Sequence, residues 1–372
     1  MQVYRRRLLT LILIPISLLM IVLARGNSWI AEYVLARGIY KFLSQVLSNI
    51  TGLIPISIME FSIYTFIIIF IVFLIHIIRL LFKDRKSIKE TIIIYLINFT
   101  CTLSVIFFLF VILAGTNYYR YPFSKINNMS VKESSIDELY ELNIYLARKA
   151  YEIRNEIELA GKDINDDGII EFNETSWDDL TKMASKAFDN LSINYPVFEG
   201  RYGRPKPVIA SKFMSRMEIT GIFWPFTLEA NVNIHVPDYT IPATMAHEIA
   251  HQRGFMREDE ANYIAFLACN YSDDLVFRYS GTMLALSIAG NALYKEDKVL
   301  YSQSREIFSE GMVADLKNKS VYWSQFEDTV ISTVSNKMND TYLKVNNQKD
   351  GVKSYGRMVD LLLAGYRDKI YY

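Results

Sequence analysis

Two histidines and a glutamate lie at a spacing that suits metal-assisted hydrolysis. His247, Glu248 and His251 form the pattern H-E-x-x-H. Because residues i and i+4 share one face of a helix, both imidazoles can reach one metal ion. Neutral imidazole suits zinc, and two histidines leave room for a third ligand and a water molecule. Zinc lowers the pKa of that water to about 7, and we expect Glu248 to take its proton as the general base.

The surroundings of the motif favour a metal site over two ordinary hydrogen-bonded histidines. The chain has only 4 histidines, and two of them fall in this spacing. Gly254 ends the helix three residues after His251, so a following carboxylate can turn back toward the metal. We expect Glu258 to be the third ligand, because a helix with small residues on its face continues from it. Glu260 is the alternative, and both acidic residues also suit a helix N-terminus without any metal.

Residues 258–262 (EDEAN) resemble the E-x-x-A-N/D signature of gluzincin metallopeptidases, in which the first glutamate completes the zinc site. Membrane peptidases of the HtpX class and antirepressor-cleaving peptidases of the ImmA/IrrE class carry this signature. Only six residues separate His251 from Glu258, fewer than in those classes, which leaves the choice between Glu258 and Glu260 open.

The chain is more similar to a bacterial membrane family described as a domain of unknown function. That family has N-terminal spans and an H-E-x-x-H-x-x-G-F…E-D-E-A-N core, and it also matches residues 221–233 (GIFWPFTLEANVN) and 354–362 (SYGRMVDLL). The resemblance covers most of the chain. It implies a zincin-like catalytic domain but no particular substrate.

A zincin usually carries an edge strand beside the metal helix, to which an extended peptide can add. Residues 226–235 lie just upstream of the motif and are the candidate strand. Thr227, Glu229, Asn231 and Asn233 are then candidates to contact substrate. The alternative is a polar strand face without such a role.

Acyl transfer also needs a group that stabilises the oxyanion. Tyr355 is the favoured candidate, with His235 and Arg357 as alternatives. The chain contains 25 tyrosines, so the sequence singles out no one of them strongly.

Residues 163–174 (DINDDGIIEFNE) match the calcium-loop pattern D-x-[DN]-x-[DN]-G-x5-E at every defined position. Gly168 allows the sharp turn of such a loop, and helical patterns flank it. The alternative is an acidic surface turn. The pattern predicts a structural Ca²⁺ site with side-chain ligands from Asp163, Asn165, Asp167 and Glu174 and the carbonyl oxygen of Ile169.

Three long apolar runs, at residues 8–24, 61–82 and 91–114, predict three transmembrane helices. A helix needs ~20 residues to cross the hydrocarbon core, and the second and third runs meet that length. The first run is shorter and follows Arg5, Arg6 and Arg7, as a signal peptide would. Since no clear cleavage site follows it, we expect an uncleaved anchor.

Positive charges predict the orientation of these helices. Three arginines precede the first run, and Lys83, Arg85, Lys86 and Lys89 surround the link between the second and third runs. Both segments are therefore expected in the cytoplasm, and residues 116–372 outside it. Residues 29–50 are too polar to span. They predict a helix that lies either on the outer membrane surface or against the soluble domain.

The remaining sequence predicts a mainly α (α+β) architecture. A membrane domain of residues 1–115 precedes a zincin-like, largely helical domain of residues 116–372 with one small sheet. Helical spacing covers residues 135–160, beginning at a serine cap and ending at Gly161, and again 176–191 and 242–270, most of 275–340, and 359–364. Strand and turn signals fill 208–236.

Composition excludes several classes of protein. The 40 basic and 40 acidic residues give no net charge, which argues against a nucleic-acid partner. Two cysteines exclude a disulfide scaffold. We therefore expect a membrane-anchored zinc metallopeptidase that acts on a peptide or protein, with Zn²⁺ and Ca²⁺ as cofactors and the lipid bilayer as a partner. A cell-wall amide hydrolase, or a non-catalytic receptor or scaffold with a structural metal, are the alternatives.

Overall fold

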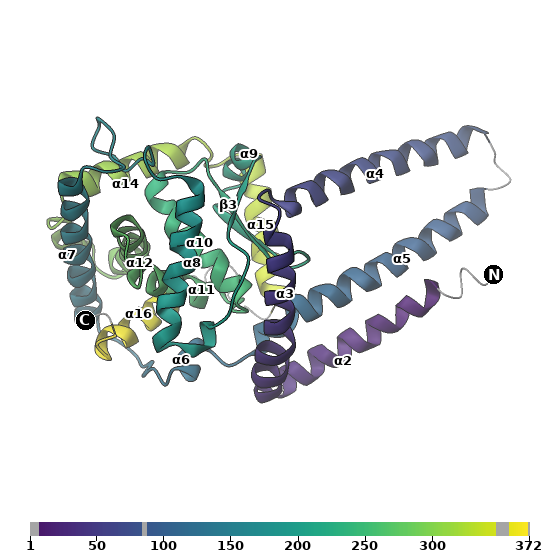
Figure 1. The fold of residues 1–372 in the computed structure, drawn as a ribbon, viewed down its shortest axis with the longest axis horizontal. Coiled ribbons are helices and arrows are strands. Elements are labelled where there is room, and N and C mark those ends of the chain that lie inside the picture. The colour runs from purple at the N-terminus through teal and green to yellow at the C-terminus, as the bar shows by residue number, and fades with distance from the viewer. Residues whose placement is uncertain (1–6, 84–87, 347–356, 371–372) are drawn as a thin grey trace.

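A computed structural model describes residues 7–83, 88–346 and 357–370 of the chain, which form a mainly helical protein with one small sheet. Figure 1 shows a helical domain from which three long helices project on one side. The N-terminal elements are η1 (Leu9–Ile12), α2 (Leu13–Gly26), the π-helix η2 (Ile30–Tyr40), α3 (Lys41–Gly52), α4 (Ile58–Lys83), α5 (Ile88–Leu113) and η3 (Gly115–Tyr119).

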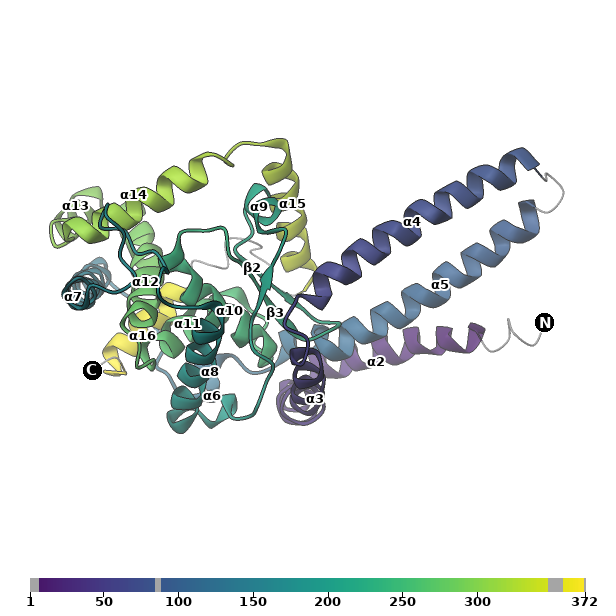
Figure 2. The same cartoon turned by 45° about the horizontal axis from the view of Figure 1, so that its top comes forward.

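The three apolar helices that the sequence predicts are present. Stretches long and apolar enough to cross a membrane occur at Leu9–Gly26, Ile58–Arg79 and Thr91–Leu113. Helices α2, α4 and α5 carry these stretches and extend away from the domain in roughly one direction (Figure 2). The chain is therefore built for association with a membrane, whereas the side on which the domain lies stays a prediction.

The polar helical stretch at residues 29–50 packs against the domain. The hydroxyl of Tyr40 donates to the carbonyl oxygens of His251 and Gln252, at 3.0 and 2.9 Å. Ser44 donates to the same Gln252 oxygen at 2.7 Å. These contacts satisfy carbonyl groups at the end of the helix that carries H-E-x-x-H, where no intrahelical partner remains. The stretch therefore contacts the domain, and its position relative to the membrane surface stays a prediction.

The rest of the chain forms helices around one core. Helix α7 begins at a capping box between Ser135 and Glu138 and ends at Gly161, which has a φ of 65°, as predicted. The helices are α6 (Phe123–Ile126), α7 (Ile136–Ala160), α8 (Trp177–Asn194), α9 (Ser211–Arg216), α10 (Ile241–Gln252), α11 (Glu258–Asn270), α12 (Leu275–Glu296), α13 (Lys298–Arg305), α14 (Glu310–Ser324), α15 (Val330–Val345) and α16 (Met358–Arg367), with short η4 (Pro196–Phe198) and η5 (Asp238–Thr240).

The sheet has three strands in the order β1-β3-β2: β1 (Lys206–Val208), β2 (Gly221–Trp224) and β3 (Glu229–Asn233). Strand β3 runs parallel to β1 and antiparallel to β2. The prediction that residues 226–235 form an edge strand is wrong, because β3 lies in the middle and all five of its residues are buried. Strand β2 is the edge on the side of α10.

Candidate metal centre

Helix α10 presents both histidines of the motif toward one point. The rings of His247 and His251 lie 4.6 Å apart between centroids and are almost perpendicular, at 88°. Their Nε2 atoms are 3.0 Å apart. Gly254, with a φ of 88°, then turns the chain out of the helix in a conformation that favours glycine.

The other nitrogen of each ring is held by an oxygen acceptor. Nδ1 of His247 lies 2.9 Å from Oδ1 of Asn262, and Nδ1 of His251 lies 2.7 Å from the carbonyl oxygen of Phe255. A carbonyl oxygen can only accept, so each Nδ1 carries the proton. In the neutral rings both Nε2 lone pairs then face the same point. This is the arrangement in which second partners prepare histidines to bind a metal.

Glu258, the first residue of α11, completes the group. Its Oε2 lies 3.2 Å from Nε2 of His247, and its Oε1 lies 3.6 Å from Nε2 of His251. Glu260 points elsewhere, because its Oε1 accepts hydrogen bonds from the N–H of Phe123 and from Arg257. Within the described ranges, the two histidines and Glu258 form the single group of three convergent His, Cys, Asp or Glu ligand atoms. The geometry therefore favours Glu258 over Glu260 as the third ligand.

The group attracts a positive charge. Burial alone would raise the pKa of Glu258, but His251 and His247 hold it well below its usual range. Burial alone would lower the pKa of His251, but Glu258, Glu248 and the carbonyl of Phe255 together outweigh burial and raise it to about 9. A cation at this point, whether a proton or a metal ion, therefore offsets the carboxylate charge.

Glu248 lies between α10 and strand β2. Burial raises the pKa of its carboxyl group, against smaller opposing effects of the two histidines and of a hydrogen bond from the backbone of Phe223. Its Oε2 is buried and has no hydrogen-bond partner in the described part of the chain. A buried carboxylate oxygen without a partner is costly unless it serves a function. Glu248 is thus held beside the edge strand β2, and its Oε2 atom is available to take a proton.

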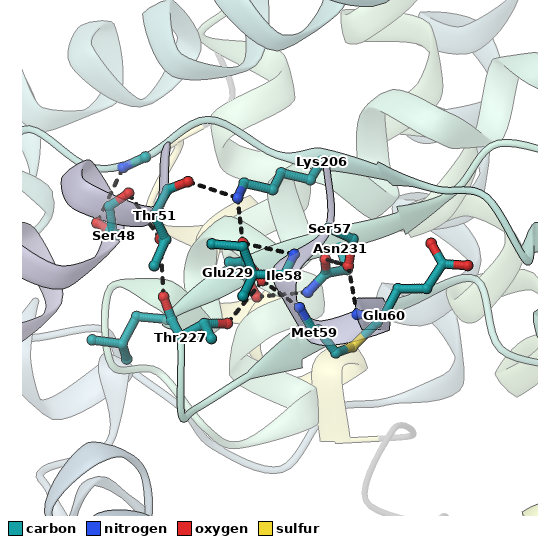
Figure 3. A network of polar contacts seen from close by, with 12 residues as sticks. Ser48, Thr51, Ser57, Ile58, Met59, Glu60, Lys206, Thr227, Glu229 and Asn231 are labelled. Atoms are coloured by element: carbon teal, nitrogen blue, oxygen red, sulfur yellow. Dashed lines mark hydrogen bonds and ion pairs between the residues drawn. The ribbon is translucent and has the colours of Figure 1, made fainter. Parts of the chain in front are cut away.

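The predicted substrate contacts instead join the sheet to α4. The carboxylate of Glu229 accepts hydrogen bonds from the N–H groups of Ile58 and Met59, at 3.2 and 2.8 Å, and forms an ion pair with Lys206 (Figure 3). Asn231 accepts a hydrogen bond from Ser57 at 2.7 Å. Thr227 donates to Glu229, and Asn233 bonds to Ser215 and the carbonyl of Ile219. Glu229, Asn231 and Asn233 are buried, so they do not offer their side chains to a substrate.

Two of the candidates for an oxyanion donor have other side-chain partners, and the third lies outside the described residues. Tyr355 lies outside them. His235 is exposed and bonds to Tyr322 at 2.9 Å, and Arg357 pairs with Asp259 at 3.3 Å.

The predicted calcium loop is held by internal hydrogen bonds. The carboxylate of Asp163 accepts from the N–H of Glu174, and the side-chain oxygen of Asn165 accepts from the N–H groups of Asp167 and Ile169. The carbonyl of Ile169 accepts from the N–H of Asn165. In the described structure, Asp163, Asp167 and Glu174 do not form a group of convergent ligand atoms. Calcium binding stays a prediction.

Two further residues were not predicted from the sequence. Asn262, which orients His247, lies in the E-x-x-A-N signature, and that signature could have identified it. Tyr342 comes from α15, far along the chain, and nothing in its local sequence indicates a role. Burial raises the pKa of Tyr342, against an opposing hydrogen bond with Tyr118, and the charge of Glu258 adds to the rise.

Comparison with known proteins gives one match. Residues 35–363 match a family model described as a protein of unknown function (DUF3810). No curated protein and no solved structure matches the chain.

Proposed function

The chain belongs to DUF3810, a family of proteins of unknown function, and we propose that it is a membrane-anchored zinc metallopeptidase that hydrolyses peptide bonds. The observation that carries this proposal is the convergence of Nε2 of His247, Nε2 of His251 and a carboxylate oxygen of Glu258, with Glu248 beside them.

The spacing of the three ligand atoms fits zinc. With metal–ligand distances of about 2.0–2.1 Å, two ligands of a tetrahedral site lie about 3.3 Å apart. The three separations here are 3.0, 3.2 and 3.6 Å. A structural zinc site is normally closed by four protein ligands, whereas a catalytic site has three and keeps one position open. The three ligands of the described group therefore favour a catalytic site.

Zinc bound here would supply Lewis-acid chemistry that makes water acidic near neutral pH. Glu248 would then hold the proton that the attacking water loses and would pass it to the leaving amine. Its position suits this role, because burial already raises the pKa of its carboxyl group toward the working range of a general base. Asn262 and the carbonyl of Phe255 keep both imidazoles in the tautomer that binds a metal.

Strand β2 offers a place for an extended peptide. It pairs with β3 along one edge only, and the rings of Phe223 and His251 lie 6.3 Å apart. A substrate added as a further strand would run past Glu248 with its backbone fixed by ladder hydrogen bonds. We propose that the domain lies outside the cytoplasm, as the loop charges predict, and acts on peptides or proteins at the membrane.

Metal analysis of the purified full-length chain tests the proposal. Wild type is expected to hold about one zinc per chain, and His247→Ala and Glu258→Gln to hold none. His235→Ala, a histidine outside the ligand group, is the matched control and should keep the metal. Glu248→Gln should keep zinc and lose peptide cleavage. Wild-type protein without zinc after chelator-free purification would refute the proposal. If Glu248→Gln keeps both its zinc and its full function, catalysis is excluded and the scaffold with a structural metal is the reading that stands.

A further inference from the structure

Helix α15 exposes an apolar face that no described segment covers. Met338 and Val345 are 68% and 76% exposed. Only Ser332, Ser335 and Leu343 are buried, so the helix turns less apolar surface inward than outward. The exposed apolar side chains fall on one side of the helix at helical spacing: Val330, Ile331, Val334, Met338, Tyr342 and Val345.

An amphipathic helix of this length needs a surface on which to pack. A 16-residue helix is only marginally stable in water by itself, and most helical stability comes from burial of the apolar face. Single exposed apolar residues are ordinary, but a contiguous stripe of them marks an interaction surface. The opposite side of α15 is polar, and Asn336 there bonds to Glu218 at 2.8 Å.

The position of α15 identifies what the stripe meets. In both views the helix lies on the side of the domain from which α2, α4 and α5 project, and it runs across their direction (Figures 1 and 2). The ring of Tyr342 lies 6.3 Å from the ring of Phe110, and its hydroxyl lies 3.1 Å from that of Tyr118. Since Phe110 belongs to the apolar stretch Thr91–Leu113, this end of α15 lies level with the last turn of a candidate span.

Helix α3 extends the same apolar region. It also lies where the long helices meet the domain, and its Phe42 is 66% exposed. Leu53, just after α3, is 82% exposed. Exposed apolar side chains thus occur on two helices that lie at the base of the candidate spans. A bilayer crossed by these spans would reach this level, and a soluble partner would have to displace its lipid.

We propose that α15 is an interfacial helix whose apolar face, centred on Met338, inserts into the boundary between the lipid headgroups and the acyl chains. Buried apolar area drives such insertion, and the polar side of the helix stays toward the domain and water. This inference does not depend on zinc binding or on catalysis.

Site-directed fluorescence tests the proposal in the full-length chain. Met338→Cys is labelled with an environment-sensitive dye, and Thr333→Cys, on the polar side of α15, is the matched control. Both are reconstituted into vesicles of phosphatidylcholine and phosphatidylglycerol. We expect a spin label attached to lipid near the headgroup to quench the dye at 338 roughly threefold more than at 333, and aqueous iodide to show the reverse order. Val334→Cys provides a second reporter on the apolar side.

Two outcomes would overturn the proposal. Equal access of iodide to positions 338 and 333 would show that the stripe faces water. Protection of position 338 from both iodide and lipid-attached quenchers would show that protein, such as a second copy of the chain, covers it. Zinc content, measured on the same samples, separates either outcome from a failure of the proposed metal site.

Discussion

The carboxylate of Glu248 lies directly against Gly221. A Cβ atom built on this glycine would lie 2.5 Å from Oε1 of Glu248 and 2.8 Å from its Cγ. Strand β2 therefore approaches α10 at a point where any side chain would displace the proposed general base. Gly221 does not have a left-handed backbone conformation. A glycine is therefore required here by the close packing against Glu248 and not by the φ angle.

Gly221→Ala is expected to move Glu248 while it leaves the zinc ligands in place. A displacement of about 1 Å of a catalytic group can cost ~100-fold in rate. We therefore expect zinc content to stay at the wild-type level and the turnover of a peptide substrate to fall by about that factor. Gly26→Ala, where a Cβ would meet nothing within 4 Å, is the control and should behave as wild type. Unchanged turnover in Gly221→Ala would argue against Glu248 as the base.

Asn262→Ala is expected to weaken zinc binding without abolishing it. The amide oxygen of Asn262 fixes Nδ1–H of His247, and loss of such a partner typically lowers metal affinity by about 10–100-fold. Competition with a zinc chelator measures the change. Asn270→Ala, on the same helix, removes an amide that bonds to the carbonyl of Phe266, and it should leave the affinity unchanged. Equal affinities in the two variants would contradict a role for Asn262.

Glu229→Gln is expected to destabilise the protein rather than to alter substrate binding. Glu229 and Lys206 form a buried ion pair, and removal of one charge from such a pair costs about 3–5 kcal/mol. The loss should appear as a lower unfolding midpoint in detergent. Glu156→Gln, at an exposed position of α7, is the control. A raised KM with an unchanged midpoint would restore Glu229 to a role in substrate contact.

Acid should break the ion pair that joins Arg367 of α16 to Glu138 at the start of α7. Arg367 bonds to both oxygens of Glu138, and this contact lowers the pKa of Glu138 to about 2. Since the folded pKa lies below the unfolded value, the stabilisation is complete above about pH 4.5 and is lost as the pH falls toward 2. The unfolding midpoints of wild type and Glu138→Gln should therefore differ at pH 6 and converge only at about pH 2 or below. A constant difference across this range would contradict the assignment.

Local signals in the sequence predicted much of the fold. Ser135 and Gly161 mark the ends of α7 because caps are short-range features that do not depend on the rest of the chain. The H-E-x-x-H spacing gave the paired histidines for the same reason, since helix geometry alone places residues i and i+4 together. The three apolar helices followed from their length and composition.

Features set by distant packing were not predictable. Alternation in residues 230–235 indicated a strand, but it could not show whether the polar side of that strand faces solvent or the buried N-terminus of α4. Glu258 and Glu260 both begin α11, and only the contact of Glu260 with Phe123 shows which of them faces the histidines. Tyr342 of α15 meets Tyr118 by tertiary packing, which leaves no signal in the sequence around it.

The bond from Tyr40 to the carbonyl of His251 joins residues 211 positions apart in the chain. At about 5–20 residues per second, a ribosome needs roughly 10–40 seconds to synthesise that interval. During this time the helix formed by residues 41–52 has no α10 to pack against, and its apolar side chains need another apolar surface to contact. The newly made membrane segment beside it is the nearest apolar surface. Helix α10, which carries the two histidines, is therefore expected to pack last, onto a helix that is already held at the membrane.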